Sequence, residues 1–424
     1  MPGRKTIRFG DAEHLLDVPQ GTLAGRLEPS CIPPRASAAE IIRSALEHPL
    51  ESAPLREFAR TGRSAAVLVP GKDRVAAASA CLPLLLDELN AAGIPDDSVE
   101  VFLATGTHAK HSAEDVAQLL GPEAAGRIRS REHDCNHEGE LRRVGTTSYG
   151  TEVLLHKSVL DADVKILTGR VIPHYFAGFG GGRKALIPGV AGFRTIRQNH
   201  RLTLDLVRGI HPRVRPCSLR GNPVHLDMLE AARLAGPVFV LNTILDTAHS
   251  VIGAYAGELE AAHEAACAEA EKAFRVELPE PVDAVITSAG GSPYDCNFMQ
   301  ALKAVFDVQE IVRPDGAILW VAQCPDGMKP GFLRWAEVDS DEGLEQAVRA
   351  DYDLTGHNSI MLRALRRRAR VAFWSGLPDE DVRALGLEPV HSLQEGVRWL
   401  CDVLPKPFRY AVVPWANVTY ATLR

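Results

Sequence analysis

The sequence predicts an α/β fold, made of two α/β domains with mostly parallel sheets and an active-site cleft between them. Two observations predict it. Continuous apolar strands alternate with segments of helical periodicity, and the same alternation begins again after the proline-containing segment 278–282. Parallel strands are covered by helices on both faces, which is why they read as unbroken apolar runs. A chain of 424 residues is long enough for two such cores, and we expect domains at residues 1–275 and 276–424.

The first domain is expected to open with a small antiparallel pair and to continue as βα units. Residues 5–10 and 14–19 flank a turn at Asp11 and form the pair. The segments expected after it are a helix at 38–48, a strand at 64–70, a helix at 75–93, a strand at 98–108 and a strand at 162–169. Gly93 is the expected C-terminal stop of its helix, because glycine adopts the left-handed conformation that ends many helices.

Polar residues follow the three expected strands of this parallel sheet. The first strand runs into the loop Gly71–Arg74, the second ends at His108, and the third leads to His174. In open parallel sheets, ligands bind outside the carboxyl ends of the strands. We therefore expect these residues to gather on one edge of the sheet.

The stretch from Pro173 to His200 concentrates reactive side chains and glycines. His174 and His200 lie on either side of Lys184, and glycine occupies positions 178, 180, 181 and 182. Glycine has no Cβ and accepts positive φ, so these positions let the backbone approach a ligand closely. We therefore expect a bound group beside Lys184.

The second half repeats the alternation after a long amphipathic helix at 256–278. The segments expected there are a strand with a glycine-rich turn at 282–295, a helix at 297–312, a turn at 313–316, and strands at 317–324, 369–376 and 410–416. Gln300 and Lys303 share one face of the helix near its N-terminus, behind Asp295 and Asn297 as candidate caps. A cation there, together with the helix dipole, suits a carboxylate.

Composition argues against several classes of partner. The net charge is −7 and the pI is about 6.1, so the chain has no excess of positive charge for binding nucleic acid. No run of 18 apolar residues occurs, and the first ten residues lack the apolar centre of a signal peptide. We therefore expect a cytoplasmic protein without a nucleic-acid or membrane partner. The eight cysteines lie far apart with no C-x-x-C, which is typical of reduced, buried thiols.

Four motifs, in the same order along the chain, resemble those of the lactate racemase family. They are TGTH ending at His108, PHYFAGFGGGRK ending at Lys184, NH ending at His200, and GGSPYDCNFMQALK with Gln300 and Lys303. Members of that family hold a nickel-pincer nucleotide and racemise or epimerise 2-hydroxy acids. The resemblance therefore implies an isomerase that inverts C2 of a 2-hydroxy acid by hydride transfer to and from this nucleotide, through a 2-keto acid. It also implies the cofactor-biosynthesis enzymes as partners.

The resemblance also implies a role for each matching residue. The cofactor, Ni-pyridinium-3,5-bisthiocarboxylic acid mononucleotide, is attached through a thioamide to a lysine that Lys184 matches. His200 matches the histidine ligand of nickel, an ion suited to planar coordination. His108 and His174 match two acid/base residues, one for each enantiomer, and an imidazole pKa of about 6.5 suits both directions near neutral pH. The remaining matches are cofactor contacts at Lys72, Asp73, Arg74, Gly181 and Gly182, and substrate contacts at Arg74, Gln300 and Lys303. The N-terminal domain would then hold the cofactor, and the C-terminal domain would contribute substrate contacts.

Two positions depart from the family's pattern. The family's loop after the first strand usually carries an aspartate three residues before an arginine, whereas here Asp73 directly precedes Arg74. Lactate-specific members place an aromatic residue immediately before the glutamine, where this chain has Met299. We therefore expect a substrate other than lactate, such as a sugar acid (an aldonate) or another larger 2-hydroxy acid.

Two other classes of function stay open on the residues alone. His108 with His111, or His133 and His137 with Cys135 between them, have spacings that also occur in zinc sites, which would indicate a zinc-dependent hydrolase. Two α/β lobes would also suit a noncatalytic sugar-acid or nucleotide-binding protein. Such a protein would keep its ligand after replacement of the lysine and the paired histidines.

Overall fold

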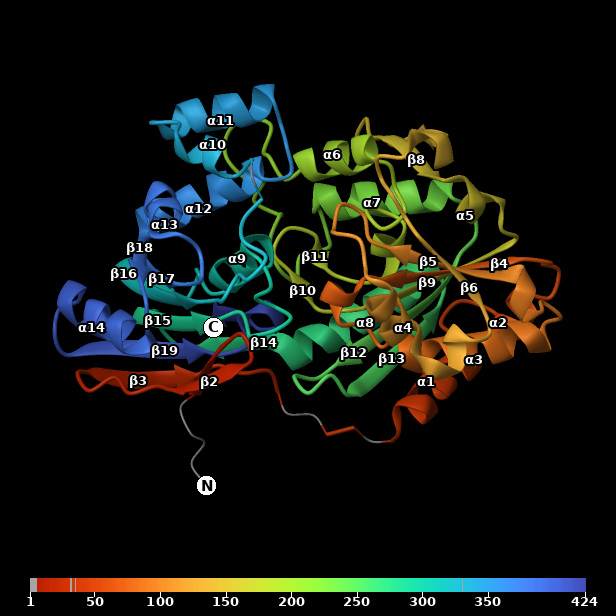
Figure 1. The fold of residues 1–424 in the computed structure, drawn as a ribbon, viewed down its shortest axis with the longest axis horizontal. Coiled ribbons are helices and arrows are strands. Elements are labelled where there is room, and N and C mark those ends of the chain that lie inside the picture. Colours follow the sequence, from red (N-terminus) through yellow and green to blue (C-terminus); the bar gives the residue numbers. More distant parts are fainter. Residues whose placement is uncertain (1–5, 31–32, 35, 330) are drawn as a thin grey trace. The chain divides into compact units, whose positions relative to one another are not determined.

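The computed structural model describes residues 6–30, 33–34, 36–329 and 331–424 (Figure 1). The chain forms two compact units. The N-terminal unit comprises residues 31–202 and 213–273, and the C-terminal unit comprises residues 1–30, 203–212 and 274–424. These units do not coincide with the ranges 1–275 and 276–424. The difference arises because a strand from the first 30 residues pairs in the sheet of the C-terminal unit.

The N-terminal unit is built on one six-stranded sheet. In spatial order its strands are β13 (Val251–Gly257), β12 (Phe239–Leu245), β9 (Val164–Arg170), β4 (Ala65–Pro70), β5 (Val99–Ala104) and β6 (Arg129–Glu132). All neighbours run parallel except β13, which is antiparallel to β12. Every residue of β9 is buried, as expected for a parallel strand covered on both faces. The predicted α/β class with mostly parallel sheets is thereby confirmed.

Helices and two hairpins complete this unit. The helices are α1 (Ala38–Glu47), α2 (Leu55–Phe58), α3 (Ala78–Ala91), α4 (Ala113–Ala125), α5 (Lys157–Asp161), α6 (Phe193–Arg201), α7 (Pro223–Leu234) and α8 (Leu259–Phe274). The hairpins are β7 (Leu141–Thr146) with β8 (Glu152–His156), and β10 (Pro173–His174) with β11 (Gly178–Phe179). Ser37 begins α1 with a capping box to Glu40. Gly93 follows α3 with a φ of +95°, as predicted for the glycine that ends this helix.

The two faces of this sheet have different covers. Val67 and Val101 point to the face where Leu82 and Leu85 of α3 pack, in one continuous apolar core. Side chains alternate along a strand, so Phe102 points to the opposite face, where its ring contacts His156 of β8 at 5.1 Å. The hairpin of β7 and β8 therefore packs on this second face.

The C-terminal unit has its own six-stranded sheet, and all of its neighbours are parallel. In spatial order the strands are β18 (Glu388–Val390), β17 (Ala369–Trp374), β16 (Val312–Val321), β15 (Val282–Ser288), β19 (Phe408–Val413) and β3 (Gly21–Arg26). Two smaller pairs are β1 (Thr6–Phe9) with β2 (Ala12–Leu15), which is the antiparallel start that the sequence predicts, and β14 (Arg275–Leu278) with β20 (Tyr420–Leu423). The helices are α9 (Phe298–Phe306), α10 (Leu333–Ala336), α11 (Asp341–Ala350), α12 (Gly356–Arg368), α13 (Asp379–Ala384) and α14 (Leu393–Val403).

Helix α9 covers one face of this second sheet and α14 covers the other. Leu319 of β16 lies in the core that includes Leu400 of α14. The next residue, Trp320, points the other way and stacks on Phe373 with ring centres 3.8 Å apart. Phe298, the first residue of α9, packs on Trp320 at 5.6 Å. This buried aromatic contact anchors the N-terminal turn of α9.

Three sequence predictions that concern this unit were wrong. The helix expected at 256–278 ends at Phe274, and residues 275–278 form strand β14. The expected turn at 313–316 lies inside β16 as an irregularity, where Asp315 has a φ of +60° and the pairing with β15 shifts register. The residues thus bulge out of the ladder without reversing the chain. The helix expected at 297–312 ends at Phe306, because Asp307 forms its C-cap.

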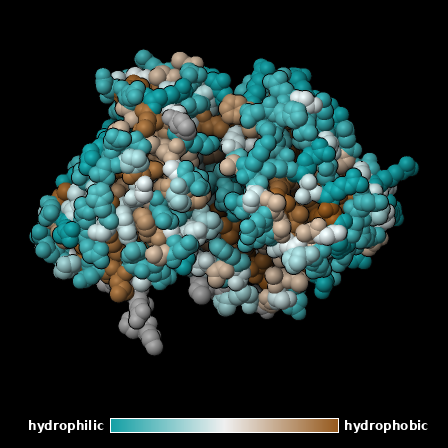
Figure 2. Space-filling view, in the orientation of Figure 1, coloured by the Kyte–Doolittle hydropathy of each residue, from teal (hydrophilic) through white to brown (hydrophobic). Residues whose placement is uncertain are grey.

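The surface in Figure 2 is mostly hydrophilic, with scattered apolar residues. Among the described residues, no helix has the length and apolar character that crossing a membrane requires.

Candidate active site

His108 leaves the end of β5 in a tight turn that is tied to a neighbouring loop. Gly106 has a φ of +58°, which a glycine adopts without strain, and its N–H donates to the carbonyl oxygen of Gly189 at 3.0 Å. The N–H of His108 donates to Thr105 O at 3.1 Å. The loop that carries His108 is therefore fastened to the segment that follows Lys184.

Asp73 and Arg74 hold the His108 ring from two sides. Nδ1 of His108 lies 2.7 Å from Oδ2 of Asp73, and Nε2 lies 2.6 Å from Nη2 of Arg74. Both residues lie in the short 3₁₀ turn η1 (Lys72–Arg74), which follows β4. The sequence predicts His108, Asp73 and Arg74 at one sheet edge, and the structure brings them together.

These two contacts determine which ring nitrogen carries the proton. A guanidinium only donates hydrogen bonds, so Nε2 of His108 accepts from Arg74. Nδ1 then donates its proton to the Asp73 carboxylate. The carboxylate orients the ring and stabilises the imidazolium that forms when Nε2 takes up a proton.

Lys72 forms an ion pair with helix α4. Its Nζ pairs with Oδ2 of Asp115 at 2.7 Å, and its backbone N–H donates to Nε2 of His111 at 3.0 Å. The ammonium lowers the pKa of Asp115 to about 2, chiefly through this hydrogen bond. The cofactor contact predicted for Lys72 stays a prediction.

Three predicted site residues meet around the buried ring of Phe176. The rings of His174 and His200 lie 4.5 Å and 4.9 Å from it, and Nζ of Lys184 lies 5.2 Å from its centroid. Tyr175 stacks on His174 at 5.1 Å. The sequence predicts the two histidines and the lysine, whereas Phe176 was missed, although an aromatic pair directly after His174 was a usable signal.

His200 is positioned through its neighbour on α6. Asn199 donates from Nδ2 to Oδ2 of Asp227 on α7 at 2.8 Å. Asp227 also accepts hydrogen bonds from the hydroxyls of Thr147 and Thr151. Burial is the largest influence on this carboxyl and raises its pKa. No sequence signal marked Asp227, because a lone aspartate in a helix is usually solvated.

The glycines beside Lys184 pack against the protein itself. A Cβ on Gly181 would lie 2.7 Å from Cγ2 of Val171, and one on Gly182 would lie 2.8 Å from Cδ2 of His263. Both residues have positive φ, +72° and +54°. The close approach expected of these glycines is thus made to neighbouring residues of the chain. Cofactor contacts at Gly181 and Gly182 stay a prediction.

Arg183 is buried beneath this loop, in the 3₁₀ turn η4 (Gly182–Ala185) that also contains Lys184. Its guanidinium donates to Ala177 O at 2.8 Å and to Nε2 of His263 at 2.7 Å. Burial lowers the pKa of Arg183 to about 10. Burial, and secondly the positive charge of Arg183, lower the pKa of His225 to about 3. Burial, and secondly the charge of Arg183, also lower the pKa of His263 well below its usual value. His225 and His263 are therefore neutral near pH 7.

Gln300 and Lys303 lie together in the C-terminal unit. Nζ of Lys303 donates to Oε1 of Gln300 at 2.5 Å across one turn of α9. Asn297 caps the helix by accepting from Gln300 N–H at 3.0 Å, as predicted. Asp295 is not a cap of this helix: its carboxylate accepts from the N–H groups of Gly10 and Gln323. It thereby fastens the loop before α9.

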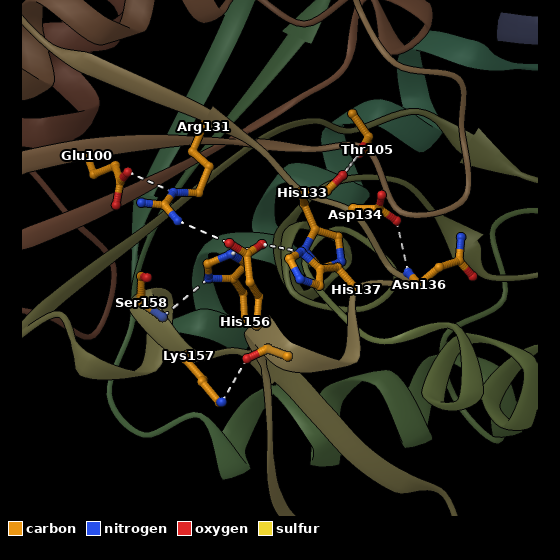
Figure 3. Close-up of polar contacts among 12 residues, drawn as sticks. Glu100, Thr105, Arg131, His133, Asp134, Asn136, His137, His156, Lys157 and Ser158 are labelled. Carbon is orange, nitrogen blue, oxygen red and sulfur yellow. Dashed lines mark hydrogen bonds and ion pairs between the residues drawn. The ribbon is translucent and has the colours of Figure 1, made fainter.

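The histidines considered as zinc ligands have separate partners. His133 donates from Nε2 to Ala191 O at 2.9 Å, whereas His137 lies 3.5 Å from the carboxylate of Glu140. Figure 3 shows both rings together with His156, which was not a candidate ligand and lies 3.4 Å from the same carboxylate. Burial lowers the pKa of His133 and of His156. Across the described part of the chain, no group of three or more His, Cys, Asp or Glu side chains could hold a metal ion.

Known proteins resemble the chain along nearly its whole length. A profile of the lactate racemase N-terminal domain matches residues 9–208, and one of the lactate racemase C-terminal domain matches residues 278–414. The lactate racemase of Thermoanaerobacterium thermosaccharolyticum is 30% identical over 417 residues, which is 96% of each chain. That of Lactiplantibacillus plantarum is 30% identical over 317 residues, 74% of this chain and 73% of that protein.

Solved structures agree with these matches. The lactate racemase apoprotein from Thermoanaerobacterium thermosaccharolyticum superposes with a TM-score of 0.88 and 26% identity, covering 98% of this chain and 99% of that chain. A Thermotoga maritima protein has a TM-score of 0.69 and 16% identity over 92% of this chain and 98% of its own, which shows a shared fold.

Proposed function

The chain belongs to the lactate racemase family, and on that premise we propose that it inverts C2 of a 2-hydroxy acid through a 2-keto acid. Its relatives indicate an isomerase, and the family uses a nickel-containing cofactor. The observation that carries the proposal is the gathering of His174, Lys184 and His200 around Phe176. The family matches do not favour the zinc-hydrolase or binding-protein alternatives.

The side chains around Phe176 fit the nickel-pincer nucleotide. Lys184 offers an amine for the covalent attachment, and His200 offers an imidazole, a ligand that suits nickel. When bound, the nucleotide supplies an electrophilic centre that accepts hydride from C2. The Asn199–Asp227 hydrogen bond holds the helix turn that presents His200. Further contacts from Gly181, Gly182 and the η1 turn follow from the family resemblance.

His108 and His174 exchange the hydroxyl proton in this proposal. His108 takes it at Nε2, while Asp73 stabilises the resulting imidazolium from Nδ1. At His174, Nδ1 accepts a hydrogen bond from the N–H of Ala177 at 3.4 Å, so the neutral ring carries its proton on Nε2, and we assign His174 as the acid/base group for the opposite enantiomer. Two bases are needed because the two enantiomers present the hydroxyl from different sides.

We assign the binding of the substrate carboxylate to positively charged side chains. Arg74 offers a planar pair of donors, and Lys303, which the structure places in the last turn of α9 and not near its N-terminus, offers an ammonium that contacts Gln300 one turn earlier. Met299, half-buried next to Gln300, stands where lactate-specific members have an aromatic residue. We therefore propose a substrate larger than lactate, such as a sugar acid.

The test is to produce the protein together with the enzymes that build the cofactor. We expect an intact-mass adduct carrying nickel, absent from a Lys184→Ala control, and inversion of C2 when 2-hydroxy acids of increasing size are screened. His108→Gln and His174→Gln should retain the adduct and lose turnover by about 10² to 10⁴-fold.

An unmodified chain, or full activity in both histidine variants, would overturn the proposal. A chain that binds zinc in place of nickel would favour a hydrolase. Retained ligand binding after replacement of Lys184 and both histidines would favour a binding protein.

A further inference from the structure

Two histidines of one loop, His108 and His111, have the same pattern of partners. In each, Nδ1 faces a carboxylate: Asp73 at 2.7 Å from His108, and Glu132 at 2.6 Å from His111. In each, Nε2 accepts a hydrogen bond from the η1 turn. Both rings are therefore held as the tautomer with the proton on Nδ1.

The donors to the two Nε2 atoms differ in kind. His111 accepts from the backbone N–H of Lys72 at 3.0 Å, which cannot leave while the turn is folded. His108 accepts from the side chain of Arg74 at 2.6 Å, which can rotate away. The His111 side chain is 3% exposed and that of His108 is 30% exposed. The first arrangement is structural, and the second is reversible and open to solvent.

The contact between Arg74 and His108 also occupies the lone pair that a base needs. While the guanidinium donates to Nε2, that nitrogen cannot accept the hydroxyl proton of a substrate. A carboxylate competes well for the guanidinium, because it is charged and accepts two parallel hydrogen bonds from it.

We propose that Arg74 is a removable cap on His108: it covers Nε2 in the ligand-free protein, and the carboxylate of an arriving ligand draws the guanidinium away and exposes the base. Nε2 of His108 is thus exposed to ligands that carry a carboxylate, and it stays covered by Arg74 when the ligand is a simple alcohol. This inference rests on the proposed function and adds a means of selecting the substrate class. It makes Arg74 a positioning residue for His108 as well as a carboxylate contact.

Diethyl pyrocarbonate tests the cap, since it modifies an accessible, unprotonated imidazole nitrogen. The rate is measured on the cofactor-free protein by mass spectrometry of tryptic peptides. Cleavage after Lys110 separates His108 from His111, so the second histidine is an internal control. The probes are acetate, which has a carboxylate without a hydroxyl, and ethylene glycol, which has hydroxyls without a carboxylate, at ionic strength matched with chloride.

We expect acetate, and not ethylene glycol, to accelerate modification of His108 in the natural chain by about tenfold, the size expected for loss of one charge-assisted hydrogen bond. Arg74→Met, which has no hydrogen-bond donor in its side chain, should react at the fast rate without acetate and gain nothing from it. Arg74→Lys, which keeps a donor, should restore part of the protection. The His111 peptide should stay slow throughout, which separates uncapping from general loosening of the loop.

Equal rates for the natural chain and Arg74→Met, or no effect of acetate on the natural chain, would overturn the cap. Acceleration at His111 in parallel with His108 would also overturn it, because a loosened loop would then explain the change. None of these measurements uses the cofactor or turnover. Failure of the cap therefore leaves the proposed isomerase intact, and failure of the adduct test leaves the cap intact.

Discussion

The amine of Lys184 lies over the ring of Phe176, with Nζ 5.2 Å from the ring centroid. The ring of Phe176 also contacts His174 and His200, at 4.5 Å and 4.9 Å. One buried aromatic side chain thus sets the spacing of three residues that are separated by up to 26 positions in the sequence.

Replacing Phe176 by leucine should impair cofactor attachment more than folding. The smaller side chain costs roughly 1 kcal/mol of stability, while the amine and both imidazoles lose their common contact. The fraction of chain with the nickel adduct, measured by intact mass, should fall severalfold. Phe179→Leu is the matched control, because Phe179 is buried in the same segment and, among the described residues, makes none of these ring contacts. Equal adduct fractions in the two variants would contradict the prediction.

Turnover in deuterium oxide should leave protium at C2 of the inverted product. In the proposed reaction the hydrogen at C2 leaves and returns as hydride, while only the hydroxyl proton passes through His108 and His174. Nuclear magnetic resonance of the product measures the isotope directly. Deuterium at C2 after one inversion would mean that C2 is deprotonated, and the hydride assignment would be wrong.

Alanine at Gly178 should destabilise the protein strongly. Gly178 has a φ of +75°, and a Cβ there would lie 2.3 Å from the backbone oxygen of Ser218. Gly150→Ala isolates the conformational cost, because Gly150 has a φ of +84° and no atom of the described residues lies within 4 Å of its Cβ position. We expect losses in the free energy of unfolding of at least about 3 kcal/mol at Gly178 and roughly 1–2 kcal/mol at Gly150. Urea unfolding measures both, and similar losses would show that the clash is relieved.

Acid should destabilise the protein partly through His225. Burial, and secondly the charge of Arg183, lower its pKa to about 3 in the folded state, against about 6.5 in the unfolded chain. Its contribution is therefore present above about pH 6.5 and is lost as the pH falls toward about 3. His225→Phe should reduce the slope of unfolding free energy between about pH 4 and 6 by about 1.4 kcal/mol per pH unit. His391→Phe is the control, since that side chain is 63% exposed, and an unchanged slope in His225→Phe would refute the assignment.

The parallel strands and the residues at their ends could be read from the chain. Unbroken apolar runs mark β4, β5 and β9, and any residue after such a strand lies at the carboxyl edge of the sheet. This is why His108 and the Asp73–Arg74 pair were predicted near one another, and the structure joins them at 2.7 Å and 2.6 Å. The order of the motifs was sufficient to identify the family, because family patterns are local in sequence.

Only the tertiary structure decided how those segments meet. It pairs β3, from the first 30 residues, with β19 near the end of the chain, and it pairs Lys72 with Asp115. It also brings Gly181 close to Val171. On α6, the residue before His200 is Asn199, which donates a hydrogen bond to Asp227 and so supports His200. The physical reason is the sequence distance over which each kind of interaction acts. Strand and helix periodicity depend on neighbours within a few residues, whereas partner choice, burial and ring contacts depend on residues that folding brings together from distant positions.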